Sequence, residues 1–236
     1  MEEELVDIDI LIKKVLSYNP DADIELLKQA HLFSNEAHGS QRRIEGSPYI
    51  EHPLSVASIL ADMKMDVSTI AAGLLHDTIE DTQISAKDIR ERFGKEIAFL
   101  VEGLTKLSKM EFLTKEVAQA ENFRKMLLAM AEDLRVILIK FADRLHNMRT
   151  LQHLPESKQQ RIASETLEIY APIANRLGIG WLRTELEDLS FRAMMPDLYK
   201  DLVRKVAKRK EEQEAYLKEV TSIVTGKLNE ESIPGK

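Results

Sequence analysis

The stretch Leu74-Leu75-His76-Asp77-Thr78-Ile79-Glu80-Asp81 places one histidine and three carboxylates directly after an apolar run. Buried imidazole and carboxylate groups cost free energy unless they are paired or bind a metal. If the segment is helical, Glu80 lies on the same face as His76 and Asp77. His76 and Asp77 could then bind a metal ion while Glu80 reaches over it. The alternative is an ordinary helix end whose acids are solvated, and this stretch alone does not decide between the two.

Any metal bound by this chain must use nitrogen and oxygen ligands, because its 236 residues include no cysteine. This excludes disulfides, thiolate zinc sites, iron–sulfur clusters and a cysteine nucleophile. The composition, 44% hydrophobic with only 9 glycines and 7 prolines, predicts a soluble, globular and helical protein.

Composition also narrows the partners and the location. No apolar run approaches the length of a membrane span, and the acidic start Met1-Glu2-Glu3-Glu4 is unlike a targeting peptide. We therefore expect a cytoplasmic protein without a membrane partner. The net charge of −7 argues against direct binding of nucleic acid but still allows a small phosphorylated ligand.

Two further candidate ligands lie outside the first stretch, at His52 and Asp143. His52 precedes Pro53, which suits the first turn of a helix, so we expect this histidine just outside that helix and pointing at a neighbouring helix end. With His76 and Asp77 the two would form a site that is neutral when it binds a divalent cation. Such mixed ligation suits a six-coordinate ion such as Mn²⁺, Fe²⁺ or Mg²⁺ better than a closed zinc site.

Asp143 belongs to the run from residue 134 to residue 151, whose first six residues alone could form a buried strand. Apolar residues recur here at every third or fourth position, which favours a helix. On that helix Asp143, Asn147 and Thr150 share one polar face. The row could line a ligand site, or it could consist of polar groups satisfied by helix packing.

Apolar periodicity and capping residues predict helices along nearly the whole chain, so the predicted fold class is all-α with about ten or more helices. Asp66 is a suitable N-cap, Ser85 and Asp88 resemble a capping box, and Pro172 should kink or split its helix. The helices are expected at residues 5–16, 26–37, 54–63, 67–76, 86–93, 97–104, 114–131, 134–151, 158–177, 181–193 and 196–228.

Arg42 and Arg43 lie in a polar loop between two of these helices. Adjacent arginines beside a turn are commonly a solvated edge. They could also clamp an anion or a base, because a guanidinium both pairs with phosphate and stacks on rings.

The ordered set His52, His76-Asp77 and Asp143 on an all-helical chain resembles the HD superfamily of metal-dependent phosphohydrolases. From about residue 22 to beyond residue 200, the chain resembles more closely the N-terminal hydrolase domain of the RelA/SpoT-type alarmone enzymes. Four motifs carry this resemblance: Ile50-Glu51-His52-Pro53, Leu75-His76-Asp77-Thr78-Ile79-Glu80-Asp81, Lys140-Phe141-Ala142-Asp143-Arg144-Leu145-His146-Asn147-Met148-Arg149-Thr150 and Tyr170-Ala171-Pro172-Ile173-Ala174-Asn175-Arg176-Leu177-Gly178.

The resemblance implies an HD-domain fold and a Mn²⁺-dependent guanosine-3′,5′-bis(diphosphate) 3′-pyrophosphohydrolase. Such an enzyme converts (p)ppGpp to GDP or GTP and pyrophosphate and thereby controls the stringent response. Its residues correspond by position: His52, His76, Asp77 and Asp143 to the metal ligands; Glu80 and Asp81 to the acidic pair that handles the attacking water; Arg43 to the residue packed on guanine; Asn147 and Thr150 to nucleoside-contacting positions.

A synthetase domain follows the hydrolase domain in this family, and its motifs are absent here. We therefore expect residues 1–195 to form the hydrolase domain, and residues 196–236 to form a long connecting helix and linker towards synthetase and regulatory domains in cis. One departure is Ile44, where the family often has a second basic or polar residue after Arg43; Arg42 could compensate. Two alternatives stay open: a nucleotide-sensing regulatory domain without turnover, and an HD phosphohydrolase acting on another nucleotide.

Overall fold

The computed structural model describes residues 7–44, 46–108 and 132–230. Within these ranges every regular element is a helix, and the extended backbone contributes an isolated bridge between Arg42 and Pro48. The all-α prediction is therefore confirmed. The helix predicted at residues 114–131 lies outside the described residues, as do the acidic N-terminus and the last part of the predicted linker.

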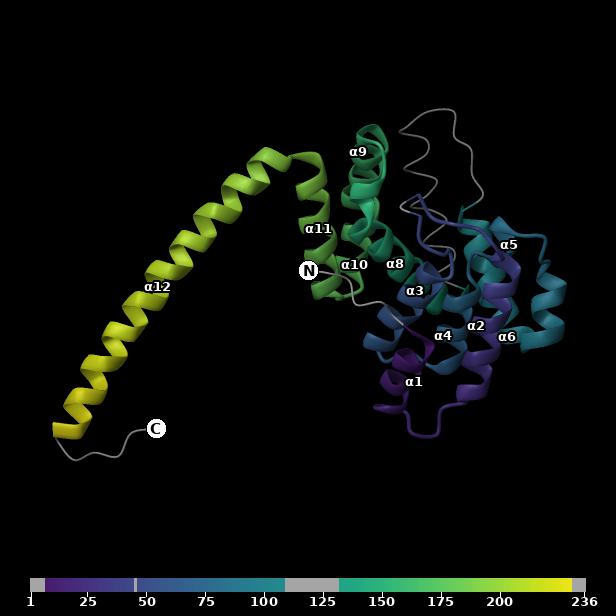
Figure 1. The fold of residues 1–236 in the computed structure, drawn as a ribbon, viewed down its shortest axis with the longest axis horizontal. Helices are drawn as coiled ribbons and strands as arrows, with labels where there is room; N and C mark the ends of the chain where they lie inside the picture. Colours follow the sequence, from purple (N-terminus) through teal and green to yellow (C-terminus); the bar gives the residue numbers. More distant parts are fainter. Residues whose placement is uncertain (1–6, 45, 109–131, 231–236) are drawn as a thin grey trace. The chain divides into compact units, whose positions relative to one another are not determined.

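The chain divides into two compact units, Met1–Ser190 and Phe191–Lys236. The first unit contains all the predicted site residues. Its elements, with α11 shared between the units, are α1 (Ile8–Leu16), α2 (Ile24–His38), α3 (Glu51–Asp62), α4 (Val67–Leu75), α5 (Thr78–Asp81), α6 (Ala86–Ser108), α8 (Leu134–Arg149), the 3₁₀ turn η1 (Leu151–His153), α9 (Glu156–Glu165), the π-helical turn η2 (Thr166–Tyr170), α10 (Ala171–Arg176) and α11 (Gly180–Met194) (Figure 1).

Helix α4 is the centre of the first unit, and it packs against α2, α3, α6 and α8 (Figure 1). Every residue from Thr69 to Leu75 is buried, because a helix that is apolar on all sides is stable only when other helices cover it. Gly73 allows α3 to approach closely: a Cβ atom here would lie 2.6 Å from Cδ1 of Leu60. Since α3 and α4 are consecutive, closely packed helices joined by a short turn, the start of α3 lies beside the end of α4.

Side-chain caps define where the site-bearing helices begin. The carboxylate of Asp66 accepts the backbone N–H of Thr69 at 3.0 Å and so caps α4, as predicted. Asp133 caps α8 in the same way, accepting the N–H of Arg135 at 2.9 Å. The predicted capping box is also present, since Ser85 N–H donates to Asp88 at 2.8 Å.

One predicted boundary changed in the structure and another was confirmed. Helix α3 begins at Glu51, so His52 lies inside its first turn and not just outside the helix. Proline lacks an N–H, but the first turn leaves N–H groups unbonded in any case, so Pro53 fits there. The predicted break near Gly94 is confirmed by its φ of 86° within α6, a conformation that favours glycine.

The predicted interruption at Pro172 is present as a π-helical turn. Residues Thr166–Tyr170 form η2 between α9 and α10, directly before the proline. Because proline removes one helical hydrogen bond, the preceding turn must satisfy its carbonyl groups by another pattern.

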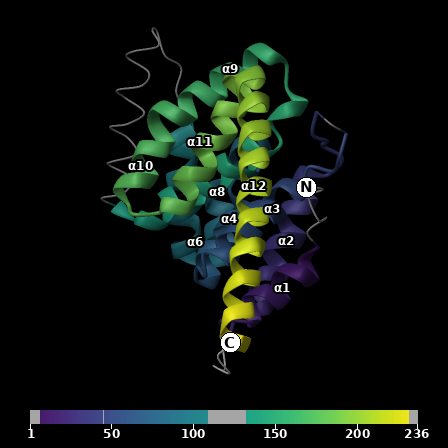
Figure 2. The same cartoon turned by 90° about the vertical axis from the view of Figure 1, so that its left-hand side faces the viewer.

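The second unit consists mainly of α12 (Pro196–Glu230), a continuous 35-residue helix (Figure 2). Within this unit the rings of Phe191 and Tyr199 pack edge to face at 5.7 Å. Leu198, Leu202 and Val206 are exposed on this helix. The predicted domain boundary at 195/196 stays a prediction. Among the described residues, no helix is both long and apolar enough to cross a membrane.

We predict that Asp66→Ala lowers the free energy of unfolding by about 1 kcal/mol, the usual cost of losing an N-cap acceptor. Urea denaturation followed by circular dichroism measures this change. Asp66→Asn is the matched control, because its amide oxygen can still accept the Thr69 N–H. Equal destabilisation by both substitutions would show that the cap is not the cause.

Candidate metal centre

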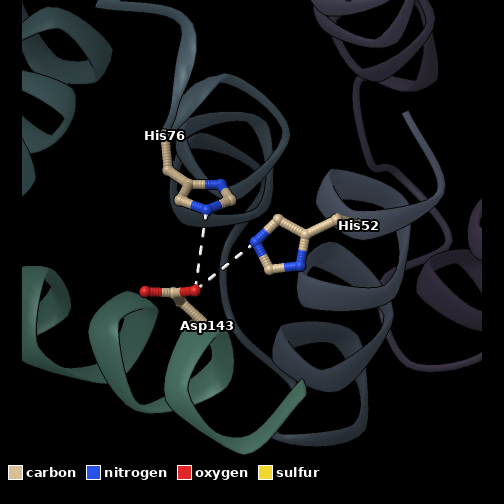
Figure 3. A group of neighbouring side chains, drawn as sticks. All are labelled: His52, His76 and Asp143. Atoms are coloured by element: carbon tan, nitrogen blue, oxygen red, sulfur yellow. Dashed lines mark ion pairs between the residues drawn. The ribbon is translucent and has the colours of Figure 1, made fainter. Parts of the chain in front are cut away.

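His52, His76 and Asp143 meet in the interior of the first unit, although they are far apart in the sequence. One ligand atom from each lies within 4.8 Å of the other two. The side chains point at one another from the start of α3, the end of α4 and the middle of α8 (Figure 3). Nε2 of His52 and of His76 lie 3.4 and 4.0 Å from the same oxygen, Oδ1 of Asp143. The exposed fractions of His52, His76 and Asp143 are 3%, 3% and 7%, so all three residues are buried.

The ring of His76 is held in one orientation by the helix that it ends. Its Nδ1 lies 2.8 Å from the carbonyl oxygen of Gly73, which can only accept, so Nδ1 carries the proton. Nε2 is therefore the atom that can present a lone pair to a bound metal, and this buried atom has no hydrogen-bond partner. Although Oδ1 of Asp77 is only 3.0 Å from it, the two are not aligned as a hydrogen bond. A buried nitrogen without a partner, close to carboxylate oxygens, is the arrangement expected of a metal ligand.

The ring of His52 is oriented by a residue that the sequence analysis did not identify, His146. The Nδ1 atoms of the two rings are 2.7 Å apart in the interior. Burial and the neighbouring His52 and Arg43 lower the pKa of His146 to about 2, so this ring is neutral. When His52 donates from Nδ1 to His146, its Nε2 is free to bind a cation. The signal that could have identified His146 is its position, one helical turn after Asp143 on α8.

Asp77 lies between two helices, so Glu80 is not on one continuous helix with His76, which was the condition for placing both on one face. Helix α4 ends at Leu75 and α5 begins at Thr78. Asp77 is the N-cap of α5, yet its side chain makes no capping hydrogen bond. Its two oxygens instead face the imidazoles, at 3.0 Å from Nε2 of His76 and 3.5 Å from Nε2 of His52. Because of this break, the Asp77 carboxylate points into the site beside Asp143.

Asp143 is held by two neighbours on its own helix. Lys140 donates to Oδ2 at 2.8 Å and Asn147 donates to Oδ1 at 2.5 Å. Burial alone would raise the pKa of Asp143, but Lys140 and the histidines hold it well below its usual range. The carboxylate therefore stays ionised inside the protein.

The site requires positive charge when it holds no metal. Burial alone would lower the pKa of His76, but the carboxylates of Asp77 and Asp143 outweigh this effect and raise it to about 9. In the absence of a metal, a proton on His76 supplies that charge. The two imidazole nitrogens and two carboxylates, without any thiolate, match the ligands preferred by six-coordinate divalent cations. The residues present therefore fit a divalent metal.

The residues predicted to contact a nucleoside lie next to this centre. Nη2 of Arg43 is 3.4 Å from Oδ1 of Asn147 and 3.5 Å from Oγ1 of Thr150. Asp143, Asn147 and the C-cap residue Thr150 therefore form a row with Arg43, in which Asn147 contacts both Arg43 and Asp143. Arg42 instead donates to the carbonyl of Gly46 at 2.8 Å, and Ile44 is 66% exposed.

Glu80 and Asp81 lie on the short helix α5, directly after the helix break. Glu80 is half-buried and Asp81 is exposed. Both backbone N–H groups bond to the carbonyl of Asp77, at 3.1 and 2.9 Å. The two acids are therefore held close to the candidate metal centre through the backbone of Asp77.

Comparisons with known proteins place the chain in a family. The HD domain family matches residues 30–180. A "GTP pyrophosphokinase" of Myxococcus xanthus is 52% identical over 94% of this chain, and the "Bifunctional (p)ppGpp synthase/hydrolase SpoT" of Escherichia coli strain K12 is 50% identical over 93% of it. The chain spans only 30% and 31% of the length of these two proteins.

A solved structure is also similar, with a TM-score of 0.57 and 27% identity over 71% of this chain and 94% of that one. That structure is described as "A metazoan ortholog of SpoT hydrolyzes ppGpp and plays a role in starvation responses". The chain belongs to the HD-domain family of helical proteins. Within this family, the predicted resemblance to the RelA/SpoT-type alarmone enzymes is confirmed.

We predict that His146→Leu weakens binding of a divalent cation by about 10- to 100-fold, the usual effect of removing the partner that orients a histidine ligand. Calorimetric titration with Mn²⁺ in the absence of any nucleotide measures this affinity. His146→Asn should retain most of it, because an asparagine oxygen can replace Nδ1 as acceptor. The exposed His153 provides the control His153→Leu. An unchanged affinity in His146→Leu would contradict the orienting role.

Proposed function

We propose that this chain hydrolyses the 3′-pyrophosphate of (p)ppGpp, using one divalent cation, and releases GDP or GTP and pyrophosphate. Water attacks the phosphorus attached to the 3′ oxygen, and the bond between this phosphorus and the 3′ oxygen breaks. In the cell this activity would lower the alarmone concentration and so control the stringent response.

The observation that carries this proposal is a buried His-Asp centre flanked by two acids and an arginine–asparagine–threonine row. The names of the curated relatives include both synthesis and hydrolysis, and the chain spans less than a third of each protein. The solved structure supports hydrolysis, because 94% of that chain is covered and that protein is described as hydrolysing ppGpp. A centre built for a divalent cation and water favours the same activity.

His52, His76, Asp77 and Asp143 would bind the cation, which we propose to be Mn²⁺. Asp77 is part of this set because its oxygens face both imidazoles. A divalent cation bound here would lower the pKa of a water molecule and neutralise charge on the phosphoryl group. His52 and His76 keep both Nε2 atoms available for it, because their Nδ1 atoms are already hydrogen-bonded.

Glu80 and Asp81 would orient the attacking water and accept its proton, as general bases do. Their position one turn after the ligand Asp77 supports this role, since the backbone bonds fix α5 relative to the centre. No phosphorylated enzyme intermediate is needed, because water can attack directly.

Arg43, Asn147 and Thr150 would bind the nucleoside. A guanidinium can stack on guanine while the amide and hydroxyl groups accept or donate hydrogen bonds. Arg42 is engaged by the carbonyl of Gly46, and Ile44 offers no charge, so Arg43 would be the principal contact of this loop with the base.

The partners and the remaining chain complete the proposal. The relatives are about three times as long as the matched segment. Synthetase and regulatory domains in cis are therefore proposed, with residues 1–195 as the hydrolase domain and 196–236 as the connection. The cytoplasmic location and the absence of direct nucleic-acid binding stay predictions.

We predict that Asp77→Ala abolishes release of pyrophosphate from ppGpp, because it removes a carboxylate from both the cation and the imidazoles. A coupled pyrophosphate assay with Mn²⁺ measures the rate. Asp21→Ala, at an exposed aspartate, should retain the native rate. Full activity in Asp77→Ala, or no activity of the native chain with any divalent cation, would contradict the proposed function. Tight nucleotide binding without turnover would favour the sensing domain instead.

We predict that Arg43→Gln raises KM for ppGpp about tenfold, which corresponds to about 1.4 kcal/mol of lost binding. The rate constant kcat should change little, because base stacking is present in both the ground and transition states. Arg42→Gln is the neighbouring control and should leave KM nearly unchanged. Equal increases in both variants would show that Arg42 also binds the base.

A further inference from the structure

Tyr49 connects the metal centre to the acidic pair, although no motif of the sequence assigned it a role. Its hydroxyl oxygen lies 2.7 Å from Oδ2 of Asp77 and 2.7 Å from Oδ2 of Asp81. Asp77 is a proposed ligand of the cation, and Asp81 is a proposed base for the attacking water. One side chain therefore contacts both parts of the proposed machinery.

The hydroxyl of Tyr49 acts as a neutral donor between two carboxylates. The carboxylate oxygens that face this hydroxyl are acceptors, so the hydroxyl is the donor. A single O–H group can donate to one carboxylate at a time. Oδ2 of Asp77 and Oδ2 of Asp81 both lie at hydrogen-bonding distance, so the hydroxyl can donate to either one. Both carboxylates are therefore held next to the same hydroxyl group.

The ring of Tyr49 is fixed by α2 and by its own loop. It stacks on the ring of His38, with centroids 4.3 Å apart and an interplanar angle of 20°. Its backbone N–H donates to the carbonyl of Gln41 at 3.1 Å. His38 is itself held, because its Nδ1 lies 2.9 Å from Oε1 of Gln41.

Gln41 also binds the end of α5, where Asp81 lies. Its Nε2 donates to the backbone carbonyl of Asp81 at 3.0 Å. The end of α5 is therefore attached to the loop twice, through the Asp81 backbone by Gln41 and through the Asp81 carboxylate by Tyr49. Asp81 is otherwise an exposed side chain, which would sample several rotamers in solvent.

We propose that Tyr49 is a positioning residue that holds the Asp81 carboxylate at a fixed place relative to Asp77. The inference rests on the proposed function, since it names the reaction in which Asp81 acts. A general base contributes fully only when it lies within hydrogen-bond reach of the water whose proton it accepts. Tyr49 would provide this geometry without touching the substrate, by limiting the rotamers of Asp81 and the rotation of Asp77.

The alternative is a tyrosine that only stabilises the fold. Tyr18 supplies the matched comparison, because its hydroxyl also makes a partly buried hydrogen bond, to the carbonyl of Met65 at 2.8 Å. Tyr49→Phe and Tyr18→Phe both remove one hydroxyl and keep the ring. A merely structural role would give the two variants similar effects on unfolding and on catalysis.

The test compares both variants with the native chain by steady-state kinetics on ppGpp, by Mn²⁺ calorimetry without nucleotide, and by urea unfolding. Tyr49→Phe should lower kcat about 10- to 100-fold, the usual effect of losing a supporting hydrogen bond at a metal site, and should leave KM nearly unchanged. It should also weaken Mn²⁺ binding, while Tyr18→Phe should change only the unfolding midpoint. A native kcat in Tyr49→Phe, or equal losses in both variants, would overturn the proposal.

A double variant shows whether Tyr49 acts through Asp81. If it does, at saturating Mn²⁺ the combination of Tyr49→Phe with Asp81→Ala should be no slower than Asp81→Ala alone, because residues that act as a unit are not additive. Fully multiplicative losses would overturn the proposal.

The calorimetric measurement separates this proposal from the proposed function. If the native chain hydrolysed no ppGpp, the proposed function would fail. Weaker Mn²⁺ binding in Tyr49→Phe would then still support the proposal that Tyr49 positions the Asp77 carboxylate. Unchanged Mn²⁺ binding would overturn that proposal.

Discussion

Two ionised carboxylates, Asp77 and Asp143, face the same enclosed space, and their charge must be balanced there. Bringing like charges together in a medium of low polarity is unfavourable without a cation. Lys140 supplies positive charge on one side of Asp143. His76 supplies the rest, because its pKa is raised and the ring stays protonated when no metal is bound. A divalent cation can take over that role. The other features of the site follow from this requirement.

The fold meets the requirement by placing the site at the end of its most buried helix. Helix α4 is covered by α2, α3, α6 and α8, so the groups at its C-terminal end enter the interior. The helix then breaks between Leu75 and Thr78, and the hydroxyl of Thr78 donates to the carbonyl of Leu75 at 2.6 Å. The break frees the Asp77 carboxylate from helix capping, so it can face the histidines.

A second group of residues, to which the sequence analysis assigned no role, orients the proposed ligands. The carbonyl of Gly73 and the ring of His146 each occupy one nitrogen of a histidine ligand, and Tyr49 contacts the oxygen of Asp77 that faces His52. Such partners decide which nitrogen carries a proton and where each lone pair points. They come from α4, α8 and the loop before α3, so the packing of the whole unit determines the chemistry of its centre.

The sequence by itself determined the helices, most of their caps and the residue types of the site, because periodicity and capping depend on near neighbours in the chain. It also indicated His52, His76, Asp77 and Asp143, since no thiolate competes with them and their order is typical of the family. Only the tertiary structure decided that the Asp77 carboxylate faces both imidazoles, that α3 already includes His52, and that His146 and Tyr49 contact the proposed ligands. His52 and His146 are separated by 94 positions and Tyr49 and Asp77 by 28. No local pattern encodes such distances, which arise only when α3, α4 and α8 pack together.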